Sequence, residues 1–256
     1  MKGAWKRNGL RCLAVLLALC LAPLGVGSAS TAVDAAPLTA RSGTTNGMVR
    51  VFLSSLGNPS ALTLTIAGSY TVNGDASQTL SSGSQVQVGF SSATGELTLT
   101  RNGYASSMGQ YFVLRRHSAT GSNGIKIAQA RQPGNPYPGD LSFRAVRQSS
   151  GTYKLYTVAH IYMESYLYGV LPYEMGNSAG LEALKAQAVA ARTYTLRMMS
   201  SRASGYYDVV DTTSDQVYNG TPSGNANCVA AIDATKGVVL MSGSSFTMTY
   251  YSASNG

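Results

Sequence analysis

The sequence has little charge, little cysteine and little histidine. Only 12% of its 256 residues are charged, and it contains three cysteines and two histidines. Without a dense cluster of Lys and Arg, a nucleic-acid partner is excluded. Neither His117 nor His160 lies near a serine-nucleophile motif or in a His-x-x-x-His pair, and no glycine-rich loop leads into Lys-Ser/Thr. Zinc needs Cys or His ligands at suitable spacing, so we expect neither a metal nor a cofactor.

The first residues have the pattern of a secretory signal. Four basic residues among the first eleven precede the apolar run Cys12–Leu21, and small residues follow. The run is shorter than the roughly 20 apolar residues of a membrane span, although an uncleaved anchor remains the alternative. Leu19 disfavours lipidation of Cys20. We therefore predict a signal peptide over residues 1–29 and a secreted or cell-envelope-associated protein.

Removal of this segment changes both the charge and the cysteine count. The formal charge falls from +8 to +4, because four of the basic residues leave with the signal. A mildly basic protein favours an anionic partner such as a cell-wall polymer. Cys228 is then the last cysteine, which excludes an intramolecular disulfide. We expect it to be a buried apolar residue, since it stands in an apolar stretch.

The remaining chain divides into a linker, a β-rich module and a helical part. Residues 30–47 are rich in small and polar residues and are predicted to be a linker. Alternating segments separated by turn residues then predict an antiparallel module over 48–160, with Asn73-Gly74 as one turn. The expected strands cover 48–53, 62–66, 70–75, 85–90, 97–100, 141–146 and 153–158.

The pattern changes after residue 180. Residues 181–199 are dense in helix formers and contain neither Gly nor Pro, which predicts one long helix. Residues 206–226 resemble a loop, and 237–241 and 246–251 are expected to be strands. The fold class is therefore α+β, with a β-rich N-terminal module and a second region, 161–256, whose long helix packs on strands.

Two acidic residues stand close together in an unusual setting. Glu164 and Glu174 flank a segment of aromatic and apolar residues, 166–173. Such surroundings raise the pKa of a carboxyl group, so that it can donate a proton to a leaving oxygen near neutral pH. We expect Glu174 on a loop or helix edge just before the long helix. The alternative is that it only caps that helix or pairs with it.

Two cations share one face of the predicted helix. Lys185 and Arg192 are seven residues apart, about 20° from one line along an ideal helix and about 10 Å apart along its axis. They could neutralise buried acids. They could instead steer Glu174 and bind a substrate.

Several segments together resemble a known family. These are residues 164–175, with Glu174-Met175, residues 182–194, residues 211–220, residues 234–240 and residues 250–256. With these segments the sequence resembles the stage II sporulation protein D family, which includes amidase-enhancer proteins. The resemblance is strong over about 160–256 and weaker from Met48, where the family also has a β-rich region.

The resemblance implies a peptidoglycan lytic transglycosylase. Such enzymes cut the bond between N-acetylmuramic acid and N-acetylglucosamine and leave a 1,6-anhydro end, with one residue acting first as acid and then as base. The family motifs imply that Glu174, Lys185 and Arg192 are catalytic. We also expect the substrate to be bound by Tyr168, Tyr173, Gln187, Gln216, Tyr218, Ser252 and Ser254. The tyrosines, together with Tyr166, could form an exposed aromatic groove for the substrate. The alternative is that they pack in the core.

The sequence departs from the family pattern at two places. Asp211–Asp215 has neither Cys nor His, so the zinc site of some relatives is not expected. The family motif that includes residues 250–256 normally continues beyond Gly256, so the second region is expected to be incomplete.

The first alternative function is a non-catalytic module that binds cell wall and stimulates a partner amidase, an N-acetylmuramoyl-L-alanine amidase. The second is a purely structural envelope role.

Overall fold

The computed structural model describes residues 47–117 and 123–251. The predicted signal peptide, all but the last residue of the predicted linker, and Ser252 and Ser254 lie outside the described residues.

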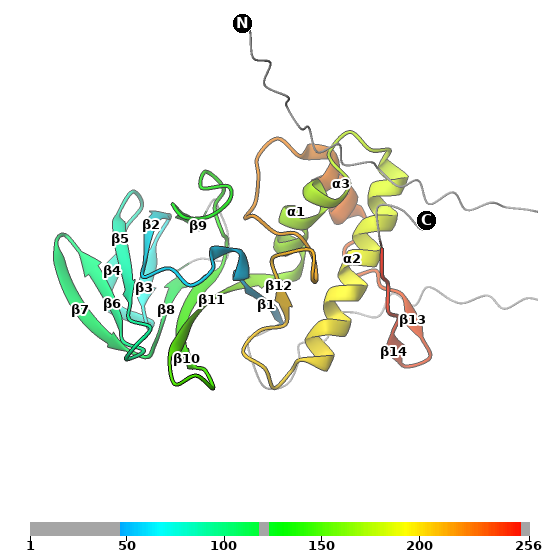
Figure 1. The fold of residues 1–256 in the computed structure, drawn as a ribbon. Helices are drawn as coiled ribbons and strands as arrows, with labels where there is room; N and C mark the ends of the chain where they lie inside the picture. The colour runs from blue at the N-terminus through cyan, green and yellow to red at the C-terminus, as the bar shows by residue number, and fades with distance from the viewer. Residues whose placement is uncertain (1–46, 118–122, 252–256) are drawn as a thin grey trace, which may run out of the picture.

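Strands dominate the first two thirds of the described chain and helices the last third (Figure 1). The strands are β1 (Met48–Phe52), β2 (Ala61–Ala67), β3 (Tyr70–Val72), β4 (Asp75–Leu80), β5 (Gln85–Phe90), β6 (Leu97–Arg101), β7 (Tyr104–Gly109), β8 (Tyr111–Arg116), β9 (Gly124–Ile127), β10 (Asp140–Arg147), β11 (Tyr153–Tyr162), β12 (Val209–Val210), β13 (Met241–Ser242) and β14 (Ser245–Phe246). The helices are α1 (Met163–Glu174), α2 (Leu181–Ser201) and α3 (Ala226–Ala234), with a 3-10 turn at Ser54–Leu56. The α+β class is confirmed, and α2 packs against β12 and β14.

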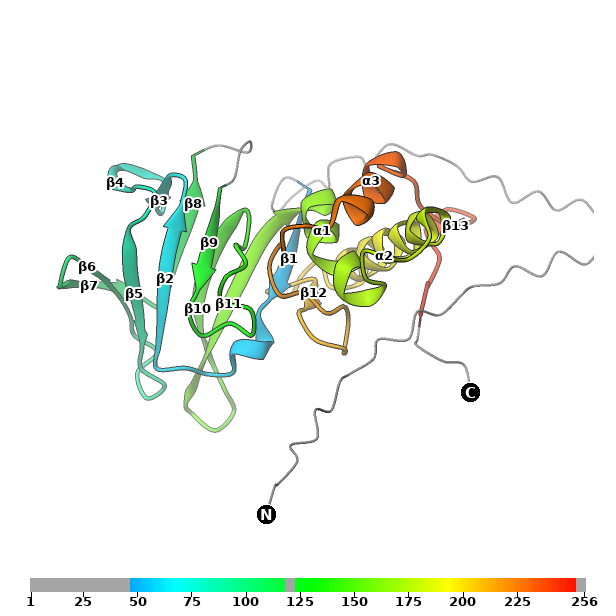
Figure 2. The same cartoon turned by 90° about the horizontal axis from the view of Figure 1, so that it is seen from above.

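The strands form two larger sheets and one short hairpin. One sheet has the order β12-β1-β11-β10-β8-β3-β4, and the other has the order β7-β6-β5-β2-β9. β13 and β14 pair with each other. β1 runs antiparallel to β11 and parallel to β12, so the first strand lies beside segments more than a hundred residues later. Figures 1 and 2 show the helices at one end of the molecule, with β1 and β12 between them and the remaining sheet strands.

Alternation of apolar and polar residues explains these strands. In β2 the side chains of Leu62, Leu64 and Ile66 are buried and their neighbours are half-exposed, because successive side chains of a strand point to opposite faces. Asn73 and Gly74 have φ of 54° and 82°, which matches the turn that joins two antiparallel strands most tightly. The predicted turn between β3 and β4 is therefore confirmed.

The helices form a layer of their own. α2 contacts both α1 and α3, and α1 contacts α3. The buried positions of α2 include Leu184, Ala188 and Ala191, which follow one another by three or four residues. Alanine at two of them lets the neighbouring backbones approach closely. None of the helices in 47–117 and 123–251 is both long and apolar enough to cross a membrane.

The structure corrects part of the sequence-based assignment. The predicted helix over 181–199 is confirmed, but α1 and α3 were not predicted. The strands expected at 237–241 and 246–251 are wrong in extent, because only β13 and β14 are strands there. Residues 238–240 instead bind α2: the Val238 carbonyl accepts from Arg192, and the Leu240 N–H donates to Thr193. These bonds replace those of a sheet.

Candidate functional site

Glu174 is the last residue of α1 and lies half-buried beside the loop that follows β12. Its Oε1 accepts a hydrogen bond from the Val217 N–H at 3.1 Å. Burial raises the pKa of the Glu174 carboxyl above its ordinary value, and the Val217 hydrogen bond partly opposes this rise. The C-terminal end of a helix also disfavours a negative charge. The position therefore favours a carboxyl that keeps its proton to higher pH than an exposed glutamate does.

A buried polar network holds the loop that contacts Glu174. Gln216 is fully buried, and its Oε1 accepts from the hydroxyls of Tyr166 at 3.0 Å and Thr195 at 2.8 Å. Its Nε2 donates to the Ala191 carbonyl at 3.2 Å and to the Tyr251 hydroxyl at 2.9 Å. Because every polar atom of this side chain is bound, the next residue along the chain presents its N–H to Glu174 in a fixed position.

Tyr251 is a neighbour of Glu174 that the sequence analysis did not single out. Burial raises the pKa of the Tyr251 hydroxyl, and the negative charge of Glu174 raises it further. The Gln187 side chain donates toward this hydroxyl, which lowers its pKa. The Tyr251 hydroxyl therefore lies beside both Glu174 and Gln187 and also accepts from Gln216.

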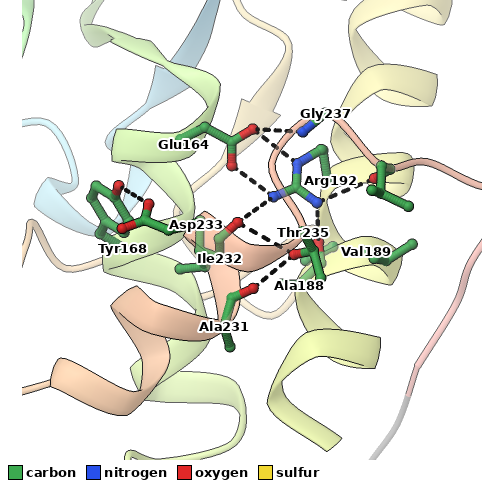
Figure 3. Close-up of polar contacts among 12 residues, drawn as sticks. Glu164, Tyr168, Ala188, Val189, Arg192, Ala231, Ile232, Asp233, Thr235 and Gly237 are labelled. Atoms are coloured by element: carbon green, nitrogen blue, oxygen red, sulfur yellow. Dashed lines mark hydrogen bonds and ion pairs between the residues drawn. The ribbon is translucent and has the colours of Figure 1, made fainter. Parts of the chain in front are cut away.

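Arg192 is fully buried and binds Glu164 rather than Glu174. Its Nε and Nη2 donate to the two carboxylate oxygens of Glu164 at 3.0 and 2.6 Å, a two-pronged pair (Figure 3). It also donates to the carbonyls of Val238 at 3.1 Å and Ile232 at 3.4 Å. One guanidinium therefore joins α2 to α1, to α3 and to the segment after α3.

Lys185 lies closer to solvent on the same helix. Its Nζ pairs with Glu182 at 2.8 Å, one turn earlier, and the Glu182 side chain is 84% exposed. In the part of the chain that the structure describes, neither Lys185 nor Arg192 contacts Glu174. The structure thus brings Arg192 together with a buried acid, one of the two arrangements expected from the sequence, and leaves Lys185 in an exposed pair.

The predicted substrate-binding residues fall into separate environments. Tyr168 donates to Asp233 at 2.6 Å on the α3 side. The Tyr173 hydroxyl accepts from Asn135 at 2.8 Å and is half-exposed. Tyr218 is fully buried, with its ring 5.1 Å from that of Tyr166. Gln216 and Tyr218 are therefore core residues in this structure, whereas Tyr173 precedes Glu174 in α1 and Gln187 lies beside Tyr251.

Two contributors to the site could not be recognised by residue type. Val217 acts through its backbone N–H, which any residue except proline offers. Asn135 lies in the irregular loop after β9 and reaches both Tyr173 and the Asn219 carbonyl, at 2.8 and 3.0 Å. Tyr251 stood inside a recognisable motif, but no feature distinguished it from its neighbour Tyr250. Within the described ranges, no three side chains of His, Cys, Asp or Glu form a group that could hold a metal ion.

Comparison with known proteins bears on the same region. Residues 152–241 match the family described as Stage II sporulation protein. A 90-residue stretch is 48% identical to the amidase enhancer of Bacillus subtilis, and covers 35% of this chain and 12% of that protein. A 97-residue stretch is 41% identical to an uncharacterised protein of Brachyspira hyodysenteriae, and covers 38% of this chain and 26% of that protein. The chain thus spans about a quarter or less of these relatives. The matched residues, 152–241, hold Glu174 and its neighbours, so this region is similar to the stage II sporulation protein family.

Proposed function

We propose that this protein is a peptidoglycan lytic transglycosylase that cuts glycan strands during cell-wall remodelling or sporulation. The observation that carries the proposal is the Glu174 carboxyl, whose pKa is raised by burial at the C-terminal end of α1. Its identity with the glutamate of the family's Glu-Met motif supports the assignment.

Glu174 acts in this proposal first as acid and then as base. The protonated carboxyl gives its proton to the glycosidic oxygen, and the bond from that oxygen to C1 of N-acetylmuramic acid breaks. The resulting carboxylate takes the proton of the C6 hydroxyl, whose oxygen bonds to C1 and closes the 1,6-anhydro ring. The Val217 N–H stabilises the carboxylate formed between the steps. No water enters the product, so a second carboxylate at a set distance is not needed.

The other predicted residues take supporting roles. Arg192 acts as a positioning residue, because its pair with Glu164 fixes α1, the helix that ends in Glu174. Lys185 can leave its exposed partner Glu182 and meet an anionic group of the strand. Tyr173, Gln187 and Tyr251 line the approach to the carboxyl, and Tyr168, Gln216 and Tyr218 support that wall from within. Ser252 and Ser254 complete the predicted set. We also propose that the chain is exported by its N-terminal segment.

The proposal is tested by mass spectrometry of glycan strands freed of their stem peptides. The chain with Glu174 should release muropeptides with 1,6-anhydro ends, and Glu174→Gln should reduce their yield by at least a hundredfold. Glu96→Gln is the matched control, because Glu96 is exposed in the turn before β6, and it should keep full activity. Full activity of Glu174→Gln would refute the assignment.

A second candidate function is suggested by the name of one relative. The B. subtilis protein is an amidase enhancer, and the corresponding function for this chain is that of a non-catalytic wall-binding protein that stimulates an N-acetylmuramoyl-L-alanine amidase. That function predicts co-sedimentation with cell wall and a faster amidase, without any new anhydro or reducing ends. It also predicts that Glu174→Gln keeps the stimulation.

A further inference from the structure

A hollow of about 570 Å³ lies apart from Glu174, between the sheet and the turn after α2. Its lining includes Tyr156 of β11, Tyr206 and Tyr207 of the turn, and the ion pair of Arg202 with Asp215. None of these residues belongs to the site that the sequence predicted. An aromatic lining with a few fixed polar groups is the usual composition of a ligand site.

The aromatic wall follows from strand register. Arg144 on β10 stands opposite Tyr111 on β8 and opposite Tyr156 on β11, so the three side chains share one face of the sheet. The Arg144 guanidinium lies 4.2 Å from the Tyr111 ring centre and 5.3 Å from that of Tyr206. Tyr206 meets Tyr156 edge-on with the ring centres 5.9 Å apart. Sheet and turn therefore build one continuous aromatic surface.

The rings in this surface are open to solvent. Tyr206 is 54% exposed and Tyr111 is 42% exposed. Large exposed aromatic side chains held in place by cations are common at recognition sites rather than on an ordinary surface. A flat ring with free area and a neighbouring hydrogen-bonding group offers a platform for the apolar face of a pyranose.

Charge at the hollow favours an acidic ligand. Arg202 lies in its lining, and Arg144 lies 5.3 Å from the ring of Tyr206, which lines it. Lys154 lies 5.5 Å from the ring of Phe52, which itself stacks on Tyr156 at 4.5 Å. Asp215 is the one carboxylate of the lining, and Arg202 neutralises it through two hydrogen bonds of 2.6 and 3.1 Å. Arg144 and Lys154 therefore add positive charge beside the hollow, which attracts anionic groups.

We propose that this hollow is a second binding site, for an acidic polysaccharide whose sugar ring stacks on Tyr206 and whose carboxylate meets Arg144. The choice of a peptide-free peptidoglycan strand as that polysaccharide rests on the proposed function, since its muramic acid units carry a free carboxylate once the stem peptides are gone. Neutral glycans lack this group and bind more weakly.

A short segment connects the hollow to the Glu174 site. Asp215 lines the hollow, and Val217, two residues later, donates its N–H to Glu174. Two residues span at most about 7 Å. The segment is pinned on both sides, by Arg202 and Tyr194 on Asp215 and by the bonds of Gln216. A strand seated in the hollow is therefore held a short way from the carboxyl that cuts it.

The test measures binding by titration calorimetry on the full chain that carries Glu174→Gln, so that the probe is not cut. The probes are peptide-free glycan oligomers of alternating N-acetylglucosamine and N-acetylmuramic acid, neutral N-acetylglucosamine oligomers of equal length, and oligothymidylate. The acidic oligomer should bind more tightly than the neutral one. Tyr206→Ala should weaken its binding about tenfold, and Tyr206→Phe should keep it, because the ring face makes the contact.

Two further variants separate charge from stacking. Arg144→Gln should weaken binding of the acidic oligomer several-fold, reduce its dependence on salt and leave the neutral oligomer unchanged. Tyr104→Ala is the matched control, since Tyr104 is 82% exposed on β7 of the other sheet, and it should change nothing. An unchanged affinity in Tyr206→Ala, an equal loss in Tyr206→Phe, or tighter binding of oligothymidylate would each overturn the proposal.

The outcome is independent of the cutting reaction. If Tyr206→Ala loses no affinity while Glu174 still yields anhydro ends, the hollow is not a binding site and the proposed function stands. If the hollow binds the acidic strand while no anhydro ends form, the binding site stands and the transglycosylase does not.

Discussion

The raised pKa of Glu174 links stability to pH. Because burial favours the protonated form in the folded protein, this residue contributes stability that is complete below the ordinary pKa of a glutamate and is lost as pH rises through the folded value. Glu174→Gln cannot ionise, so it should be more stable than the parent at pH 8 and lose that advantage at pH 4. Urea unfolding at both pH values checks this. An equal advantage at both would show that the carboxyl does not titrate in this range.

Substitution of Arg192 tests whether this residue holds α1 in place or contacts the substrate directly. Removing one partner of a buried pair typically costs about 3–5 kcal/mol, and Arg192 leaves behind both Glu164 and two carbonyls. Arg192→Lys should lower the free energy of unfolding by roughly 2 kcal/mol or more, because an ammonium cannot make the two-pronged contact. Denaturant unfolding measures this loss. A fully stable Arg192→Lys variant with impaired cutting would instead indicate direct contact with the substrate.

His160 provides a second pH-dependent contribution to stability. Burial lowers its pKa to about 4, against partial opposition from Asp140, and its Nε2 lies 2.8 Å from the Ser142 hydroxyl. A lowered pKa on a base stabilises the fold above the unfolded value of about 6.5, and this stability is lost as pH falls towards 4. His160→Gln should therefore remove part of the acid sensitivity seen in thermal melts between pH 6.5 and 4. Identical pH profiles would contradict this prediction.

At the scale of elements, α1 depends on a glycine that a helix would normally avoid. A Cβ at Gly169 would meet the ring of Tyr218 and would lie 2.6 Å from the Gly220 carbonyl oxygen. Alanine usually stabilises a helix interior by about 1 kcal/mol over glycine, but here Gly169→Ala should destabilise by about 1–3 kcal/mol through overpacking. Thermal unfolding measures the sign. Gly134→Ala, with open space around its Cβ, should be close to neutral.

The close approach of Gly169 to the Tyr218 ring also explains why α1 could not be predicted from the sequence. Local alternation was enough for β2 and β5, and the run of helix formers was enough for α2. α1 contains Gly169 and Pro172, both poor helix formers, and is stabilised by packing against α2, α3 and the Tyr218 ring. No local pattern contains that packing. For the site, the sequence singled out Glu174, but the contacts of Val217 and Asn135 depend on loops brought together only in the folded chain.

At the scale of the whole molecule, the first strand belongs to the region that contains the site. β1 pairs with β11 and β12, and Arg50 on β1 binds Asp208 through its Nη2 at 2.7 Å. The predicted boundary after residue 160 falls within β11 and stays a prediction. A fragment of residues 152–251 lacks β1 and should fail to fold cooperatively, whereas residues 47–251 should fold. Chemical-shift dispersion in NMR spectra distinguishes the two, and a dispersed spectrum from the short fragment would contradict the expectation.

In the proposed reaction Glu174 serves as both acid and base, and no water enters the product. The most direct measurement is digestion of peptide-free glycan strands in water enriched in oxygen-18, followed by mass spectrometry of the new ends. The proposed reaction should give 1,6-anhydro ends that lack one water and carry no heavy oxygen, and Glu174→Gln should abolish these ends. New reducing ends that carry heavy oxygen would show hydrolysis and would contradict it.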